Sequence, residues 1–185
     1  MTTIVDGTTG ITFPSAIAGV SATQQYSGRA LQILSVTDTT QYVFNSGSPN
    51  QYTYYDVTSL TVSITPTSSS SRILVMADIC ASQYNNVYNA FFRCMRNSTA
   101  IGTGVVGSYG GTSTSAIRTS DGGEIGTVSI NYLDSPATTS STTYKVQICN
   151  AGGSTYPSYV NRPANSNTGW EQTGSSTITV MEIAG

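Results

Sequence analysis

The chain is built from short stretches in which apolar and polar residues alternate. Between residues 60 and 65, Leu60, Val62 and Ile64 share one face, and the residues between them are Thr or Ser. Because successive side chains of a strand point to opposite faces, this period of two predicts β-strands. Alternating stretches bounded by turn residues predict strands at 30–36, 41–44, 53–56, 60–65, 72–80, 89–96, 124–132, 142–149 and 175–183. No window keeps the apolar spacing of an amphipathic helix.

The turns between these strands indicate how the sheets are built. Pro66 cannot donate to a central ladder, so residues 65–71 are predicted to turn. Asn97 and Ser98 are expected to reverse the chain, with 99–101 returning as a strand. This series of antiparallel strands predicts an all-β fold, an antiparallel jelly-roll-like β-sandwich over residues 30–185. Two long connections, 102–123 and 150–174, are expected to be functional loops or to contain short unrecognised strands.

The last strand carries apolar residues on both faces. Ile178 and Val180 point one way, and Met181 and Ile183 point the other. A strand covered on both faces lies inside a sandwich or against another chain. These four residues are therefore candidates for a subunit interface, and a central strand of a monomeric sandwich is the alternative.

Residues 1–29 differ from the rest of the chain and are expected to form an extended N-terminal arm. They combine small residues with few bulky ones, so burial within the arm cannot offset the entropy lost on ordering it. Order would come from a neighbouring chain. We expect the arm to anchor the protein through Ile4, Ile11 and Phe13.

Charge is scarce, which restricts the possible partners. Only 9% of the residues are charged, against about 25% in ordinary soluble proteins. The net charge of −2 provides no basic stripe for nucleic acid. No segment is apolar and long enough to span a membrane, and the N-terminus lacks the pattern of a signal peptide. A surface this poor in charge favours self-association.

The residue types argue against an enzyme. The chain has no histidine, which removes the commonest general base and most transition-metal sites. Its three cysteines are expected to be buried thiols made in a reducing cytosol. Asp134 is expected to cap a turn and Glu182 to pair with an arginine. Residues 119–124 resemble a β-turn more than a calcium loop. We therefore predict no catalytic residues, no metal and no cofactor.

Aromatic residues in the long connections are the strongest candidates for ligand contact. Tyr109 lies in the first connection, and Tyr156, Tyr159, Arg162 and Trp170 lie in the second. An exposed ring offers a flat apolar face to a sugar, and a neighbouring arginine offers hydrogen bonds to its hydroxyls. The alternative is that these rings only hold the loops against the sandwich.

Five blocks of the chain, in order, resemble a module of tail-fibre and other virion proteins of tailed bacteriophages, including phages of marine bacteria and cyanobacteria. Its layout is similar to the trimeric jelly roll of the tumour-necrosis-factor and complement type. The blocks are LQILSVTDTT, YDVTSLTVSITPTSSSSRILVMADI, FFRCMRNSTAIGTG, YLDSPATTSSTTYKVQI and SSTITVMEI. The opening TTIVDGTTGITFP is similar to a segment of phage fibre chains, and its place directly after Met1 predicts a small stand-alone protein.

The resemblance implies a homotrimeric structural protein of a virion, made in the cytoplasm of a bacterial host. In trimers of this type the last strand lies near the threefold axis. The first hypothesis is a fibre or receptor-binding module that attaches to other phage virion proteins through its arm and contacts a glycan or protein of the host surface. The alternative is a trimeric decoration protein that stabilises the capsid and binds no receptor.

Overall fold

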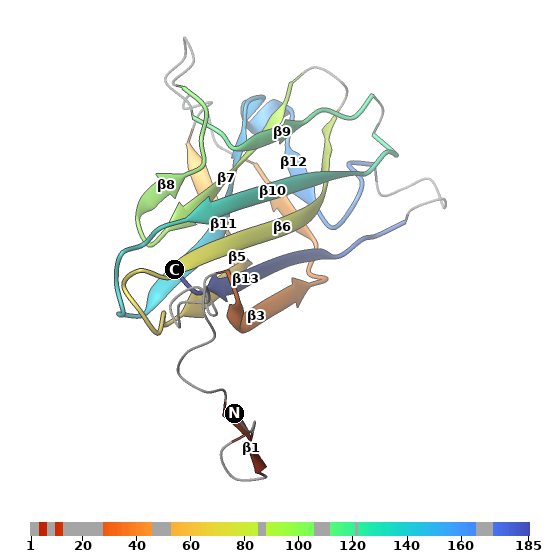
Figure 1. Cartoon of the computed structure of the whole chain (residues 1–185). Helices are drawn as coiled ribbons and strands as arrows, with labels where there is room; N and C mark the ends of the chain where they lie inside the picture. The colour runs from red at the N-terminus through yellow and green to blue at the C-terminus, as the bar shows by residue number, and fades with distance from the viewer. Residues whose placement is uncertain are drawn as a thin grey trace.

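A computed structural model describes residues 4–6, 10–12, 28–45, 53–84, 88–105, 112–120, 122–165 and 172–185 (Figure 1). Apart from turns and loops, these residues form strands and the short 3-10 helix η2 (Gly153–Thr155). The elements are β1 (Ile4–Asp6), β2 (Gly10–Thr12), β3 (Ala30–Asp38), β4 (Tyr42–Phe44), β5 (Tyr54–Ile64), β6 (Arg72–Gln83), β7 (Ala90–Arg96), β8 (Thr99–Ile101), β9 (Ser115–Ile117), β10 (Gly126–Asp134), β11 (Thr142–Asn150), η2 (Gly153–Thr155), β12 (Ser158–Val160) and β13 (Ser176–Ile183).

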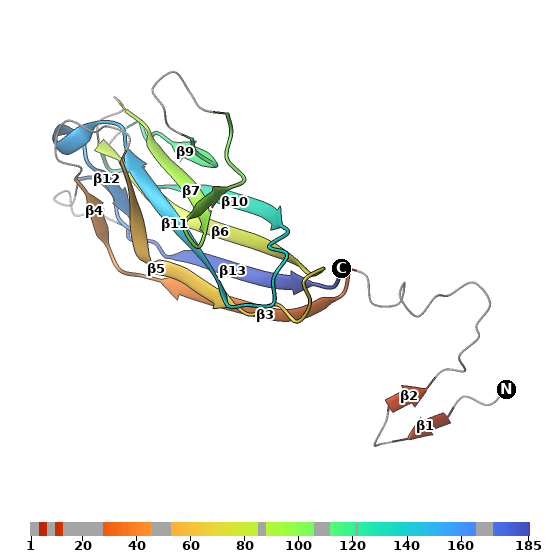
Figure 2. The same cartoon turned by 90° about the vertical axis from the view of Figure 1, so that its left-hand side faces the viewer.

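Two antiparallel sheets stack face to face as a sandwich (Figure 2). In the first sheet β13 lies between β3 and β6, and β10 pairs with the other edge of β6. β12 pairs with β6 beyond the end of β13, and β4 pairs with β12. The second sheet runs β5, β11, β7, with β8 and β9 both on the far edge of β7. At most of its long connections the chain crosses from one sheet to the other. This winding is typical of a jelly roll. The predicted jelly-roll-like sandwich is confirmed.

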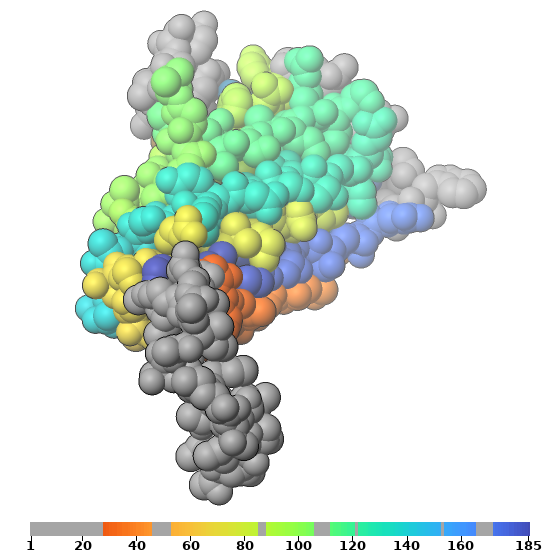
Figure 3. Space-filling view, in the orientation of Figure 1, coloured from red at the N-terminus to blue at the C-terminus, as the bar shows by residue number. Residues whose placement is uncertain are grey.

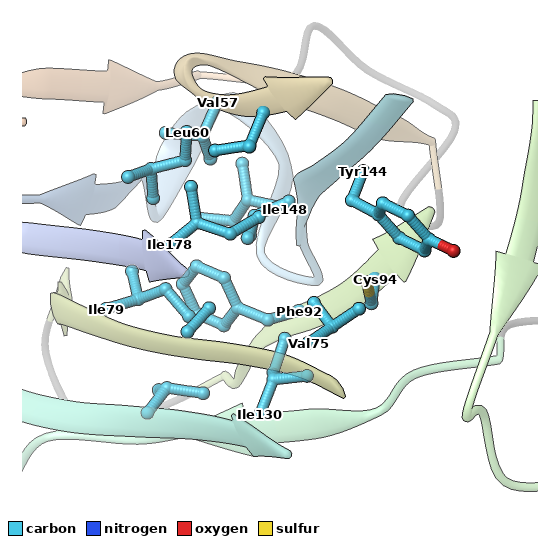
Figure 4. Close-up of a cluster of buried hydrophobic side chains, with 14 of the residues drawn as sticks. Val57, Leu60, Val75, Ile79, Phe92, Cys94, Ile130, Tyr144, Ile148 and Ile178 are labelled. Atoms are coloured by element: carbon cyan, nitrogen blue, oxygen red, sulfur yellow. The ribbon is translucent and has the colours of Figure 1, made fainter. Parts of the chain in front are cut away.

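The core lies between the two sheets and is filled by every second residue of their strands. On β6, Ile73, Val75 and Ile79 are fully buried, as are Phe92 on β7 and Ile148 on β11 (Figure 4). These side chains come from strands far apart in the sequence and meet in one contiguous cluster. Burial of this apolar area is the main force that holds the sheets together.

Most strand predictions are confirmed, and the differences have local causes. Asn97 has a φ of 51°, and Arg96 pairs with Thr99 across the predicted turn. The segments predicted at 53–56 and 60–65 form the single strand β5. A bulge divides β5. Gln147 of β11 pairs with Asp56 of β5, whereas Lys145, two residues earlier on β11, pairs with Thr61. The second long connection contains the short strand β12, and the first contains β9.

The N-terminal segment joins the sandwich beside the last strand. The amide of Gly28 donates to the carbonyl of Ala184, and the amide of Ala184 donates to the carbonyl of Arg29, both at 2.9 Å. Within the expected arm, β1 and β2 pair with each other, with Ile4 opposite Thr12 and Val5 opposite Ile11. Phe13 lies outside the described residues.

Candidate functional site

The outer face of the first sheet, which points away from the second sheet, carries a continuous row of apolar side chains. The register places Ile33 of β3 opposite Met181, Met181 opposite Leu74, and Leu74 opposite Leu133 of β10. Ile33 is 55% exposed and Leu133 is 41% exposed. We call Ile33, Met181, Leu74 and Leu133 the apolar row. Figure 3 shows the four strands that carry it side by side on one face of the molecule.

Met76 and Ile183 add two apolar side chains to this outer face, and several of its other groups are polar and pair with one another. The hydroxyls of Ser35 and Thr179 lie 2.8 Å apart, and those of Thr37 and Thr177 lie 3.0 Å apart. Farther along β6, Asp78 is exposed and accepts a hydrogen bond from a serine of β10. One end of the face is therefore apolar and the other end is rich in hydroxyl groups.

The four interface candidates of β13 divide between the two faces of the first sheet. Ile178 and Val180 are fully buried in the core between the sheets. Met181 and Ile183 are half-buried and lie on the outer face. The alternation of a strand is the reason, because one side chain in two must fill the chain's own core. Of these four residues, only Met181 and Ile183 lie on a face that points away from the chain's own core.

Glu182 lies on the inner side of β13 and is fully buried, and the prediction that it pairs with an arginine is wrong. Its Oε1 accepts hydrogen bonds from the amide and the hydroxyl of Thr67, both at 2.7 Å. Its Oε2 accepts one from the Nε2 of Gln32 at 2.6 Å. Burial alone would raise the pKa of Glu182, but these hydrogen bonds outweigh it and lower the pKa to about 2. The carboxylate therefore joins β13, β3 and the turn after β5.

Tyr156 lies in a small tyrosine cluster at one end of the sandwich. Its ring centroid lies 5.2 Å from that of Tyr88 and 6.3 Å from that of Tyr84. The carbonyl of Tyr156 accepts a 2.9 Å hydrogen bond from the buried side chain of Gln83. The three rings are half-buried. Part of each ring is thus held by packing and part faces solvent.

The other ligand-contact candidates do not join this cluster. Tyr159 is 7% exposed, and the guanidinium of Arg162 lies 5.3 Å from its ring centroid. Burial raises the pKa of the Tyr159 hydroxyl, and the charge of Arg162 partly opposes this. Tyr109 and Trp170 lie outside the described residues. The geometry of Tyr159 and Arg162 is that of a packed pair rather than an open platform.

The outer face of the second sheet carries a chain of polar side chains that the sequence analysis did not identify. Lys145 forms a 2.7 Å salt bridge with Asp56, and Asp56 also accepts a 2.6 Å hydrogen bond from Gln147. Gln147 accepts a 2.8 Å hydrogen bond from the Nε of Arg93. The guanidinium of Arg93 lies 3.8 Å from the ring centroid of Tyr54. We call these five residues the polar network. They come from β5, β7 and β11, so no local motif could have revealed them.

Two pKa shifts follow from the contacts in this network. Burial would raise the pKa of Asp56, but hydrogen bonds from Lys145 and Gln147 outweigh it, so the pKa is lowered. Burial raises the pKa of Tyr54 to about 12, with a small opposing effect of Arg93. At neutral pH the network holds two cations and one anion, and the tyrosine is neutral.

The remaining candidates for chemistry are held in hydrogen bonds or buried. Asp134 accepts hydrogen bonds from Arg96 at 2.9 Å and from the hydroxyl of Tyr144 at 2.7 Å. The three cysteines are buried and form no disulfide, and burial raises the pKa of Cys94 to about 12. Within the described residues, no group of three or more His, Cys, Asp or Glu side chains is placed to hold a metal ion. In the same part of the chain, no helix has the length and apolar character needed to cross a membrane.

Comparison with known proteins gives a likeness of fold only. No protein-family model and no curated protein sequence matches the chain. One similar solved chain comes from the T13 particle of infectious bursal disease virus, with a TM-score of 0.41 and 13% identity over 85% of this chain. Another comes from the VP2 subviral particle of the same virus, with a TM-score of 0.40 and 13% identity over 85% of this chain. This chain spans 40% and 38% of those two chains, and its function has to be inferred from its own surfaces.

Proposed function

We propose that the chain is a non-enzymatic structural protein of a tailed-phage virion. In this proposal it forms a homotrimer, attaches to the particle through residues 1–29 and displays the sandwich for host adsorption. The resemblance of its five sequence blocks to phage virion modules supports the virion role, and the jelly-roll winding of the sheets agrees with it.

The apolar row is the observation that carries the proposal. Ile33, Met181, Leu74 and Leu133 span all four long strands of the first sheet and lie at one end of its outer face. Covering such a row against another subunit removes apolar area from water, which favours association. Ile183 lies on the same face at the end of β13. The polar groups that pair at the other end of the face could form a solvated rim.

A receptor-binding role is favoured over capsid decoration by the half-buried tyrosine cluster of Tyr84, Tyr88 and Tyr156. It lies at the end of the sandwich, where η2 and β12 meet the end of β6. Tyrosines that are only partly packed keep ring area for contact with a host glycan or protein.

Two measurements test the proposal. Light scattering of the purified full chain should give three times the mass of one subunit, and a monomer would contradict the trimer. Immunogold labelling of intact particles should place the chain on the tail or its fibres. Label spread over the head would instead favour the decoration role, and no label on the particle would overturn the virion assignment.

A further inference from the structure

The outer face of the second sheet has the features of a binding site for an anionic group. This face lies on the opposite side of the sandwich from the apolar row, so it stays open in an assembly formed through the first sheet. Its polar network holds Arg93, Lys145 and Asp56, which gives a local excess of one positive charge, whereas the chain carries a net charge of −2.

Arg93 is held in place but keeps most of its donors. Its Nε donates to Gln147, and its guanidinium stacks on the ring of Tyr54. Within the described part of the chain, its two terminal nitrogens donate to no protein acceptor. A guanidinium with a fixed plane and unused N–H groups matches the two oxygens of a carboxylate or phosphate. Because the side chain is already ordered, little of its rotamer freedom would be lost on binding.

Lys145 adds a second cation on the same face. It is two residues from Gln147 on β11, so both side chains point outward. Its ammonium group binds Asp56 and can still donate to a ligand. The bulge of β5 places Asp56 opposite Gln147 and Thr61 opposite Lys145, which brings the carboxylate between the two donors. The site is therefore preorganised by backbone pairing as well as by side-chain contacts.

Two aromatic side chains of the second sheet lie beside these charges. Cys149 of β11, which follows Gln147 by two residues and is fully buried, pairs with Tyr54 on one side and with Phe91 on the other. Phe91 and Tyr54 are both half-buried. An aromatic surface next to a fixed arginine suits a pyranose ring that bears an acidic group. The C–H face of the sugar would rest on the aromatic side chains and the acid would reach the guanidinium.

From these contacts we propose that the outer face of the second sheet binds an acidic sugar residue, with Arg93 and Lys145 contacting the anionic group and Tyr54 and Gln147 positioning Arg93. The proposal rests on the proposed function in one respect, that the chain meets a surface glycan. The shared ligand chemistry is an anionic group on a sugar, and either a carboxylate or a phosphate supplies it.

Calorimetric titration of the purified full chain with short saccharides tests the site. Tetragalacturonate supplies carboxylates, glucose 6-phosphate supplies a phosphate, and maltotetraose is the neutral control. We expect one of the acidic probes to bind, with weaker binding at high salt because the contact is ionic. Arg93→Gln should weaken that binding about tenfold or more. Arg72→Gln, the same charge change on the opposite sheet, should leave the affinity unchanged.

The outcomes separate the ligand sources and the two proposals. Binding of either acidic probe that is lost in Arg93→Gln supports the site and identifies the anionic group. Equal binding of maltotetraose, unchanged binding in Arg93→Gln, or no binding of either acidic probe would overturn it. If Arg93→Gln does not fold, as judged by circular dichroism, Lys145→Gln takes its place. If no acidic saccharide binds, the proposed sugar site is wrong. The proposed virion role is tested separately, because immunogold labelling measures where the protein lies on particles.

Discussion

Met181 on β13 lies directly opposite Leu74 on β6, and both side chains lie on the outer face of the first sheet. Their neighbours on the same strands, Val180 and Ile73, are fully buried in the core. One strand therefore supplies the chain's own core and an apolar outer surface with alternate residues. Substitutions on the two sides should have different effects, one on association and the other on folding.

Met181→Asp is expected to dissociate the trimer while the subunit stays folded. In the trimer, three copies of the change would bury unpaired carboxylates, which is strongly unfavourable. In the separate subunit the new side chain would face water. Light scattering should show the mass of one subunit, and circular dichroism should show an unchanged fold. Ser63→Asp, an exposed position on the second sheet, is the matched control and should remain trimeric. A trimeric Met181→Asp would exclude this face as the interface.

Ile178→Ala is expected to lower the free energy of unfolding of the subunit itself. Ile178 is fully buried between the sheets, and truncating a buried isoleucine to alanine costs about 2–5 kcal/mol. Urea unfolding of the variant measures this cost. Met181→Ala, on the outer face of the same strand, should cost clearly less when both variants are compared as monomers. Equal costs would show that the two faces of β13 are not differently packed.

The strands could be predicted from sequence because their alternation is long and their turns contain suitable residues. The exceptions are informative. β5 was expected as two strands because the segment from Val57 to Leu60 breaks the alternation, and both of these residues are buried at the bulge. β12 has three residues, too few to show a period. Its position depends on pairing with β4 and β6, and on the amide of Asn161 donating to the carbonyl of Cys80.

The surfaces could be predicted only in part. The sequence shows that Met181 and Ile183 share a face, but the apolar row also needs Leu74 and Leu133, whose position depends on strand order and register. The polar network likewise joins three strands. Partners of buried polar groups are equally non-local, since Glu182 meets Gln32, 150 positions away in the chain.

Stability at acid pH is expected to depend on Glu182. Its pKa is lowered from 4.5 to about 2 in the folded chain. A carboxyl group whose pKa is lowered by folding contributes stability that is fully present above its unfolded pKa and lost as the pH falls through its folded pKa. The free energy of unfolding should therefore fall as the pH decreases from 4.5 toward 2.

Glu182→Gln isolates this contribution. Glutamine replaces one acceptor oxygen by an NH₂ group that would face existing donors from Thr67 or Gln32. We expect a loss of about 1–3 kcal/mol at neutral pH, shrinking as the pH falls, when urea unfolding is measured at several pH values. Glu124 is exposed and accepts hydrogen bonds from the amide and the hydroxyl of Ser120, so Glu124→Gln should change the pH dependence less than Glu182→Gln does. A constant difference between the Glu182→Gln variant and the unchanged chain from neutral pH to pH 2 would contradict the lowered pKa.

Removal of residues 1–27 is expected to leave a folded trimer that no longer joins particles. The hydrogen bonds of Gly28 and Arg29 with Ala184 remain in the shortened chain, so the edge of the first sheet keeps its pairing. As far as the structure describes the chain, the core cluster is drawn from residues 36–180, so the midpoint of thermal unfolding should change little. Incorporation is measured by supplying the full or shortened chain to particles that lack the protein, followed by sedimentation and immunoblotting. Loss of folding would show that the segment belongs to the core. Undiminished incorporation would show that the sandwich, rather than residues such as Ile4 and Ile11, makes the attachment.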